Sequence, residues 1–283
     1  MPHEPADAAA DTAAATDVLL RFEDVSVMFD DVTALDRISL EVRPAQTKIV
    51  LGAAGSGKTT LLKVAMGLVR ADTGRVFLFG QEITRMDEHA LFKLRGKVGV
   101  LFQEGGLFDS LTVADNVAYP LVNHPAISVP PDQVLPKVED ALRFVELEHT
   151  LDKFPSELSG GMRRRVGIAR AVVTEPPLVL YDSPTAGLDP ITANTIMALI
   201  AKERDTSNAA NLIVTHRYQD GQLMANFRYN RESGRLDPVS RNGAGRDTGT
   251  QFMVLNEGRL VFEGSQAELE ASRDEYVSKF VRH

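Results

Sequence analysis

The sequence feature that most constrains the fold is a glycine-rich loop set between an apolar run and an amphipathic segment. The run KIVL (48–51) is typical of a buried strand, and the apolar residues of TTLLKVAMGLV (59–69) recur at helical spacing. Between them the segment Gly52–Thr59 reads GAAGSGKT, which matches the pattern G-x-x-x-x-G-K-[ST]. A strand, loop and helix in this order predict an α/β domain with a parallel sheet.

Each residue type in this loop has a chemical duty toward a phosphate chain. Small residues let consecutive backbone N–H groups surround phosphate oxygens, and the helix N-terminus adds its positive dipole end. Lys58 is expected to reach the β- and γ-phosphates, and the Thr59 hydroxyl to ligate Mg²⁺. A chance match in a chain of this length has a probability on the order of one per cent. We therefore predict that a nucleoside triphosphate with Mg²⁺ is held by Gly52, Gly55, Ser56, Gly57, Lys58, Thr59 and Thr60.

The charge balance and the absence of cysteine exclude several classes of function. Asp and Glu number 39 against 31 Lys and Arg, which gives a formal net charge of −8. Residues 1–17 are acidic and Ala-rich without Lys or Arg, and we interpret them as a disordered leader. No broad basic surface for nucleic acid is expected. The lack of Cys rules out disulfides and thiolate metal sites. The sequence contains no apolar run of about eighteen residues, so no membrane span is predicted.

Beyond the loop, the pattern predicts one domain over 18–283. Strand-like segments return at LVLYD (178–182) and NLIVTH (211–216), and both end in a polar residue, where open α/β sheets place their ligands. The segment from about 104 to 170 is interpreted as a helical insert. Residues 227–251 contain five Arg against three acidic residues and are interpreted as an exposed loop or hairpin insertion, either solvated or a patch for acidic groups.

A second motif narrows the class of nucleotide-binding protein. Leu158-Ser159-Gly160-Gly161-Met162 precedes a predicted helix rich in Arg, and LVLYD follows that helix. Together with the glycine-rich loop, these motifs resemble the ABC (ATP-binding cassette) ATPase family, and the resemblance covers nearly everything from Val18 onward. It implies a P-loop NTPase of the ABC ATPase type: a RecA-like parallel-sheet core, an antiparallel β subdomain and a helical insert.

The resemblance also implies a homodimer. In the family, the turn matched by Ser159, Gly160 and Gly161 faces the γ-phosphate of ATP that the P-loop of a second copy holds. A helix N-terminus with bare glycines and a hydroxyl suits this duty. An isolated LSGG is equally compatible with an ordinary helix cap, in which Ser159 satisfies free backbone N–H groups.

Five further positions match family motifs, and the resemblance implies a role for each. Asp182 matches the Walker B aspartate that holds Mg²⁺, and Gln103 matches the glutamine that senses the γ-phosphate and the metal. Asp189 falls in the D-loop at the dimer seam, and His216 matches the switch histidine. Phe29 falls where the family stacks an aromatic ring on adenine, although a lone Phe in an apolar strand is usually core.

Ser183 is a departure from the family pattern, because a Glu that polarises the attacking water usually follows the Walker B Asp. A hydroxyl is too weak a base for this step, so slow hydrolysis is expected. Three interpretations remain: a slow or ATP-trapped motor, a motor that positions water with His216 and Asp189, or an introduced substitution. Glu104 is a candidate substitute carboxylate.

The segments VLFQEGGLFDSLTVADNVAYPL and DSPTAGLDPIT look most like ATPase subunits of lipid transporters that work with MCE-domain proteins. That likeness implies transmembrane permease subunits and an MCE-domain protein as partners, phospholipid as cargo, and a peripheral position at the cytoplasmic face of the inner membrane. The alternatives are the motor of an amino-acid, small-solute or lipoprotein-release transporter, and a non-hydrolysing regulatory subunit.

Overall fold

The computed structural model describes residues 18–239 and 248–282. The predicted leader 1–17, the segment 240–247 of the predicted insertion, and His283 lie outside the described residues.

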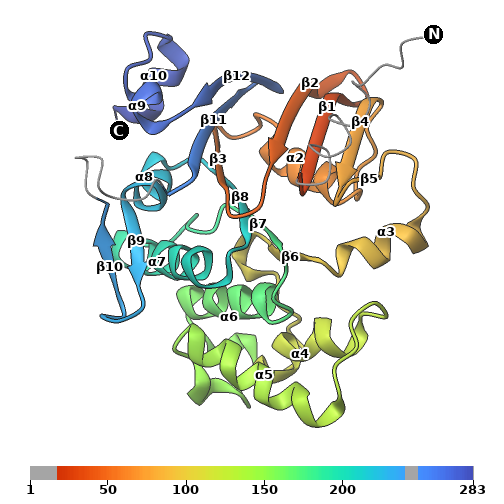
Figure 1. Ribbon diagram of the computed structural model, residues 1–283, viewed down its shortest axis with the longest axis vertical. Coiled ribbons are helices and arrows are strands. Elements are labelled where there is room, and N and C mark those ends of the chain that lie inside the picture. The colour runs from red at the N-terminus through yellow and green to blue at the C-terminus, as the bar shows by residue number, and fades with distance from the viewer. Residues whose placement is uncertain (1–17, 240–247, 283) are drawn as a thin grey trace, which may run out of the picture.

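A six-stranded sheet forms the centre of the molecule, with the order β12-β11-β3-β8-β7-β6 (Figure 1). All neighbouring strands from β11 to β6 pair in parallel, and β12 pairs antiparallel at one edge. This confirms the parallel core expected from the sequence. Its strands are β3 (Thr47–Gly52), β6 (Val98–Leu101), β7 (Leu178–Asp182), β8 (Ala210–Thr215), β11 (Thr250–Asn256) and β12 (Arg259–Gly264).

The central sheet is buried on both faces, as continuous apolar strands require. All six residues of β3 are buried. Ile49 and Leu51 join one hydrophobic core, and Val50, which points the other way, joins a second core. The first core lies against the helices that follow β6, and the second lies against α2 (Lys58–Ala65) and an antiparallel sheet.

The antiparallel sheet has the order β2-β1-β4-β5 and covers α2 (Figure 1). A Cβ added to Gly57 would lie 2.4 Å from the carbonyl oxygen of Ala34, so β2 passes directly against the glycine-rich loop. The strands are β1 (Leu20–Phe29), β2 (Val32–Val42), β4 (Thr73–Leu78) and β5 (Gln81–Glu82), and α3 (Glu88–Arg95) leads to β6.

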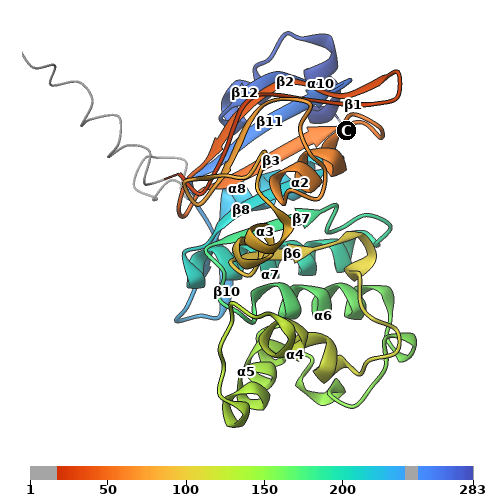
Figure 2. The same ribbon diagram turned by 90° about the vertical axis from the view of Figure 1, so that its right-hand side faces the viewer.

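A helical subdomain lies at the other end of the molecule, on the face of the central sheet opposite α2 (Figure 2). Thr112 and Asp115 form a capping box at the first helix, and buried Asn116 hydrogen bonds the backbone of Phe108 and Leu111. The helices are α4 (Val113–Asn123), α5 (Pro131–Phe144) and α6 (Gly160–Val172).

The rest of the chain completes the sheet and adds a short hairpin. The hairpin β9–β10 falls within the predicted insertion and packs against α7, so this part of the insertion is more than an exposed loop (Figure 1). No helix within the described residues is long and apolar enough to cross a membrane. The elements are α7 (Pro190–Ser207), α8 (Tyr218–Asn226), β9 (Phe227–Asn230), β10 (Arg235–Pro238), α9 (Gln266–Glu270) and α10 (Glu275–Val281).

Candidate nucleotide-binding site

The glycine-rich loop leaves β3 and enters α2 through two left-handed residues, Gly55 (φ 78°) and Gly57 (φ 101°). L-residues with side chains rarely adopt this conformation, which explains the glycines. Lys58 Nζ donates to the carbonyl oxygens of Gly52 (2.8 Å) and Ala53 (2.7 Å) and thus lies back across the loop. Burial lowers the pKa of Lys58, and the Asp182 carboxylate opposes that shift. The ammonium therefore lies within the electrostatic reach of Asp182.

Two of the three predicted metal ligands, Thr59 and Asp182, meet at the end of β7. Thr59 Oγ1 donates to Asp182 Oδ2 at 3.1 Å, and Asp182 is 7% exposed. A hydroxyl and a carboxylate oxygen held side by side are the hard donors that Mg²⁺ prefers. The loop and this pair therefore fit a magnesium-bound triphosphate, because the backbone donors, a cation and the metal's oxygen ligands converge at one edge of the sheet.

Ser183 follows Asp182 and has a left-handed backbone (φ 49°). Its hydroxyl donates to Asp182 Oδ1 at 3.2 Å, and its N–H donates to the Val214 carbonyl at 2.9 Å. Its carbonyl accepts from Arg164 Nη1 at 3.2 Å. The hydroxyl is directed at the carboxylate that is predicted to bind the metal.

Gln103 and His216 come from the ends of β6 and β8, the strands on either side of β7. Both residues are exposed. Because parallel strands end at the same edge of a sheet, both residues share that edge with Asp182. Glu104 is also exposed, with φ 61°. Burial lowers the pKa of Arg164 and the charge of Glu104 raises it, so Glu104 lies within electrostatic reach of that guanidinium.

The signature turn, formed by Ser159, Gly160 and Gly161 at the start of α6, lies on the face of the central sheet opposite α2 (Figure 2). Ser159 caps α6 by accepting from the Met162 N–H at 3.3 Å. A Cβ on Gly161 would lie 2.6 Å from Thr192 Cγ2, and one on Gly160 would lie 3.9 Å from Leu188. The cap interpretation of Ser159 is therefore correct within the chain. Because Gly160 and Gly161 have no side chains, the first N–H groups of α6 are also available for a contact with another molecule.

Asp189 caps α7, where its carboxylate accepts from the N–H groups of Ile191 and Thr192 at 3.0 Å each. Hydrogen bonds from Thr192 are the largest cause that lowers the pKa of Asp189. Ile191 is 81% exposed, so an apolar side chain stands in solvent beside the D-loop. Phe29 is 48% exposed at the end of β1, so it is not a core residue.

Two buried charged residues beside the site, Arg164 and Asp220, were not anticipated from the sequence. Arg164 Nη1 donates to the Pro184 carbonyl at 2.6 Å, and Nη2 donates to the Ala186 carbonyl at 2.8 Å. Asp220 accepts from the hydroxyl of Thr185, in the turn after β7, and from that of Thr215, at the end of β8. The sequence contains one signal that Arg164 faces inward. It lies four residues before the apolar Ile168, so the two share the inner face of α6.

A P-loop at the carboxyl edge of a parallel sheet, a Walker B aspartate bonded to its threonine, and an LSGG helix cap define a P-loop NTPase of the ATP-binding cassette type. The sequence profile of the ABC transporter family matches residues 35–186, and the chain belongs to that family. ATP and Mg²⁺ are the cofactors of these ATPases, and the loop with Asp182 supplies the donors that both need.

Relatives of two transport classes are similar to the chain. It is 29% identical to the intermembrane phospholipid transport system ATP-binding protein MlaF of Haemophilus influenzae, over 93% of this chain and 90% of that protein. It is 40% identical to the methionine import ATP-binding protein MetN of Carboxydothermus hydrogenoformans, over 65% of this chain and 54% of that protein. The chain thus spans about half the length of that methionine-import relative.

Solved structures with the same fold confirm the predicted class. The dimeric ATP-binding cassette MJ0796 in a post-hydrolysis state with ADP and Pi has a TM-score of 0.71 and 26% identity, over 87% of this chain and 98% of that one. The protein cbiO1 of Clostridium perfringens, part of the cbiONQ transporter complex, has a TM-score of 0.74 and 27% identity, over 94% of this chain and 93% of that one.

Proposed function

We propose that the chain is the energy-coupling ATPase subunit of a transporter that moves phospholipid between inner and outer membranes with an MCE-domain partner. The observation that carries the choice of cargo is the match to MlaF, which extends over nine tenths of both chains. The LFQEGGLF segment, which holds Gln103, points to the same subfamily. The subunit would lie peripherally at the cytoplasmic face of the inner membrane.

The proposed working unit is a homodimer with two composite sites. The N–H groups of the Gly52–Thr60 loop and Lys58 bind the phosphates, and Thr59, Asp182 and Gln103 hold the metal. Ser159, Gly160 and Gly161 of the second copy close the site with the N-terminal end of α6. Phe29 covers the adenine, while Asp189 and His216 orient water at the seam. The bound Mg²⁺ supplies charge neutralisation at the phosphates.

Hydrolysis in this dimer is expected to be slow, because Ser183 offers no basic group. Its hydroxyl is occupied by Asp182 Oδ1, which leaves His216 and Asp189 as the residues that hold water. Glu104, which follows Gln103 in the sequence, is the candidate substitute carboxylate, and its influence on the pKa of Arg164 puts it within electrostatic reach of that guanidinium. Turnover at ordinary transporter rates that persists in Glu104→Gln would contradict both the slow motor and the substitute base.

A hollow between the core and the helical subdomain suits the permease. It encloses 360 Å³ and is lined by the half-exposed rings of Phe102, Phe108 and Tyr119, with Arg170 beside them. The rings of Phe108 and Tyr119 lie 4.6 Å apart. An exposed, largely apolar hollow with two guanidinium groups in its wall, those of Arg95 and Arg170, fits a short amphipathic helix of a membrane subunit. Phe102, which lines the hollow, directly precedes Gln103 in the sequence. A helix docked in the hollow would therefore lie next to a residue of the proposed nucleotide site.

Amino-acid import is the second candidate function, because a methionine-import relative reaches 40% identity. The chain and its membrane partners, reconstituted in vesicles that contain a fluorescent phospholipid, distinguish the two. We expect ATP-dependent transfer of phospholipid and no uptake of methionine. Methionine uptake would reverse the assignment. Binding of ATP without any turnover, also in the presence of the permease, would favour the regulatory subunit.

Lys58→Ala tests the ATP site itself. We expect the affinity for ATP to fall by at least about tenfold, because a charge-assisted contact to the phosphates is lost. Lys63→Ala is the matched control, since Lys63 is an exposed lysine on the same helix. A fluorescent ATP analogue titrated into both variants measures the difference. Undiminished binding by Lys58→Ala would refute the proposed site.

A further inference from the structure

Asp220, on the first turn of α8, has a carboxylate that is closed off from solvent. The residue is 2% exposed, although carboxylates are almost never buried without partners. Its Oδ2 accepts from Thr185 Oγ1 at 2.6 Å and from Thr215 Oγ1 at 2.7 Å. The Arg217 guanidinium lies 3.8 Å from Oδ1. A single carboxylate oxygen therefore holds two hydroxyl groups at short distances, which is typical of strong charge-assisted hydrogen bonds.

The two threonines belong to the two loops that carry the candidate hydrolytic residues. Thr215 ends β8 directly before His216, and its hydroxyl also accepts from the Arg217 N–H at 3.1 Å. Thr185 lies two residues after Ser183, in the turn that leads to Asp189. Asp220 thus joins the turn after β7 to the loop after β8 through side chains alone.

The turn after β7 is also held from its other side. Arg164 of α6, which is 4% exposed, donates to the carbonyl oxygens of Ser183, Pro184 and Ala186. The turn after β7 therefore lies between the Arg164 guanidinium on α6 and the Asp220 carboxylate on α8. Asp220 and Arg164 thus connect the loop after β8, the turn after β7 and α6 through one chain of hydrogen bonds.

We propose that Asp220 is a positioning residue for ATP hydrolysis, which holds the His216 loop and the Ser183–Asp189 turn in one fixed arrangement. The proposal rests on the proposed function, because both loops act only in an ATP-bound dimer. Asp220 acts through Thr185 and Thr215 and does not itself face the nucleotide. With Ser183 in place of a catalytic Glu, the geometry of these two loops is what remains to orient water.

Thr185→Val and Thr215→Val each remove one hydroxyl with little change of shape. We expect each variant to lower kcat by about tenfold and to change KM for ATP by less than about twofold, because the phosphate-binding loop is untouched. Thr185→Ser keeps a hydroxyl at this position, unlike Thr185→Val, and is expected to have the wild-type kcat. The double variant is expected to be no slower than the slower single variant, because both hydroxyls act through one carboxylate.

Thr150→Val is the matched control. Thr150 is fully buried in the helical subdomain, and its hydroxyl donates to the Leu147 carbonyl at 2.7 Å. It loses a comparable hydrogen bond, so it should lower thermal stability similarly and leave kcat unchanged. Wild-type kcat in Thr185→Val, an equal loss in Thr150→Val, or additive losses in the double variant would each overturn the proposal.

Failure of the proposed function is read separately on the wild-type protein. If wild type neither binds ATP nor dimerises with it, the proposed function fails whatever the variants do. If wild type dimerises but hydrolyses too slowly for steady-state kinetics, the half-life of ATP bound in the dimer, measured in a single turnover, replaces kcat. We then expect Thr185→Val to lengthen that half-life about tenfold while the ATP concentration at half-maximal dimerisation stays within about twofold of wild type. An unchanged half-life would overturn the role of Asp220.

Discussion

Ser183 is placed by its backbone as much as by its side chain. Its N–H donates to the Val214 carbonyl on β8, its carbonyl accepts from Arg164, and its hydroxyl donates to Asp182. These contacts fix the residue that directly follows the proposed metal ligand Asp182. At the residue scale, a serine therefore occupies this position in a well-defined backbone frame.

Ser183→Glu is expected to raise the rate of ATP hydrolysis by about 10²-fold, because a positioned general base typically contributes about that much or more. Ser183→Ala is the control and should hydrolyse within about twofold of wild type, since the serine hydroxyl does not accept the proton. Phosphate release by the purified dimer measures both. A loss of more than about tenfold in Ser183→Ala would show that the hydroxyl takes part in the reaction.

Glu203 gives the fold a dependence on pH. The residue is 3% exposed on α7, and burial raises its pKa from an ordinary 4.5 to about 7, while Ser207 and Asn211 oppose the shift. The folded protein therefore binds this proton more tightly than the unfolded chain does. Its stabilising contribution is full below pH 4.5 and is lost as the pH rises through about 7.

Glu203→Gln removes this charge while keeping the shape and an acceptor for Ser207. At pH 8 the variant should exceed wild type in unfolding free energy by about 2 kcal/mol, and near pH 5 the difference should vanish. Urea unfolding at both pH values gives the comparison. Glu175→Gln, whose side chain is 79% exposed, should show no such difference. Equal stability of Glu203→Gln and wild type at pH 8 would refute the raised pKa.

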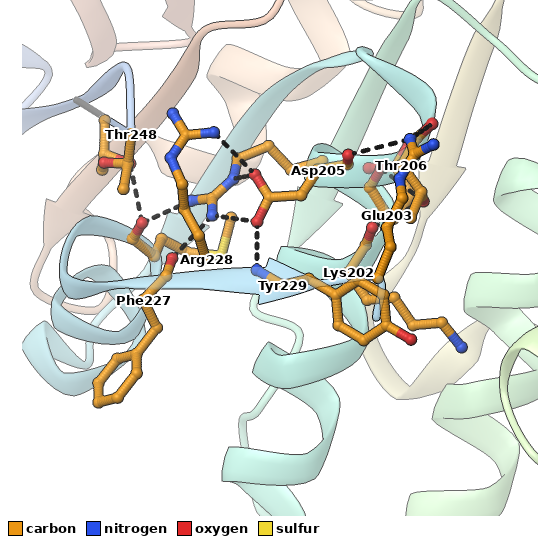
Figure 3. A network of polar contacts seen from close by, with 12 residues as sticks. Lys202, Glu203, Asp205, Thr206, Phe227, Arg228, Tyr229 and Thr248 are labelled. Carbon is orange, nitrogen blue, oxygen red and sulfur yellow. Dashed lines mark hydrogen bonds and ion pairs between the residues drawn. The ribbon is translucent and has the colours of Figure 1, made fainter. Parts of the chain in front are cut away.

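At the scale of elements, the hairpin β9–β10 is fastened to the C-terminal end of α7 by a polar network centred on Asp205 (Figure 3). Asp205 accepts from Arg204 at 2.7 Å and from the Tyr229 N–H at 2.7 Å, and it pairs with Arg228 at 3.4 Å. The side chains of Arg204 and Asp205 are 3% and 6% exposed. Arg231 donates to the Thr206 carbonyl at 2.9 Å, near the C-terminal end of the same helix.

Asp205→Ala should lower the free energy of unfolding by about 3 kcal/mol, because it leaves the buried Arg204 guanidinium without its counter-charge. ATP affinity should stay as in wild type, since the nucleotide lies at the opposite edge of the sheet. Asp237→Ala, which removes an exposed carboxylate bonded to Asn230 on the same hairpin, should cost less than about 1 kcal/mol. Urea unfolding compares them, and equal costs would contradict the anchoring role of Asp205.

The elements differ in how well the sequence predicted them. Short apolar runs predicted β3, β7 and β8 of the central sheet, and the shared carboxyl edge explains why Thr59 meets Asp182. The short helix α8 was missed, because Gly221 interrupts it and its packing is tertiary: a Cβ there would lie 2.4 Å from the Phe252 ring. Arg164 and Asp220 could not be assigned, since a buried charge is explained only by partners distant in sequence.

At the scale of the whole molecule, the hollow beside Gln103 gives the proposed transporter a testable contact. Tyr119→Asp should abolish association with the membrane subunits, because a carboxylate would be buried against their apolar side chains. ATP binding should persist. Val122→Asp on the same helix is the control, since Val122 is 64% exposed and does not line the hollow. Affinity pull-down from solubilised membranes measures both, and loss of association in both variants would remove the specificity of the contact.

The two edges of the central sheet carry different parts of this molecule. Thr250 pairs with Thr47, so β11 begins where β3 begins, at the edge opposite Gly52 and the triphosphate loop. The chain therefore enters β11 through Thr248 and Gly249, far from the proposed nucleotide site. A fluorescent reporter grafted at this entry point should leave the phosphate-binding edge undisturbed, which would make single molecules accessible to imaging.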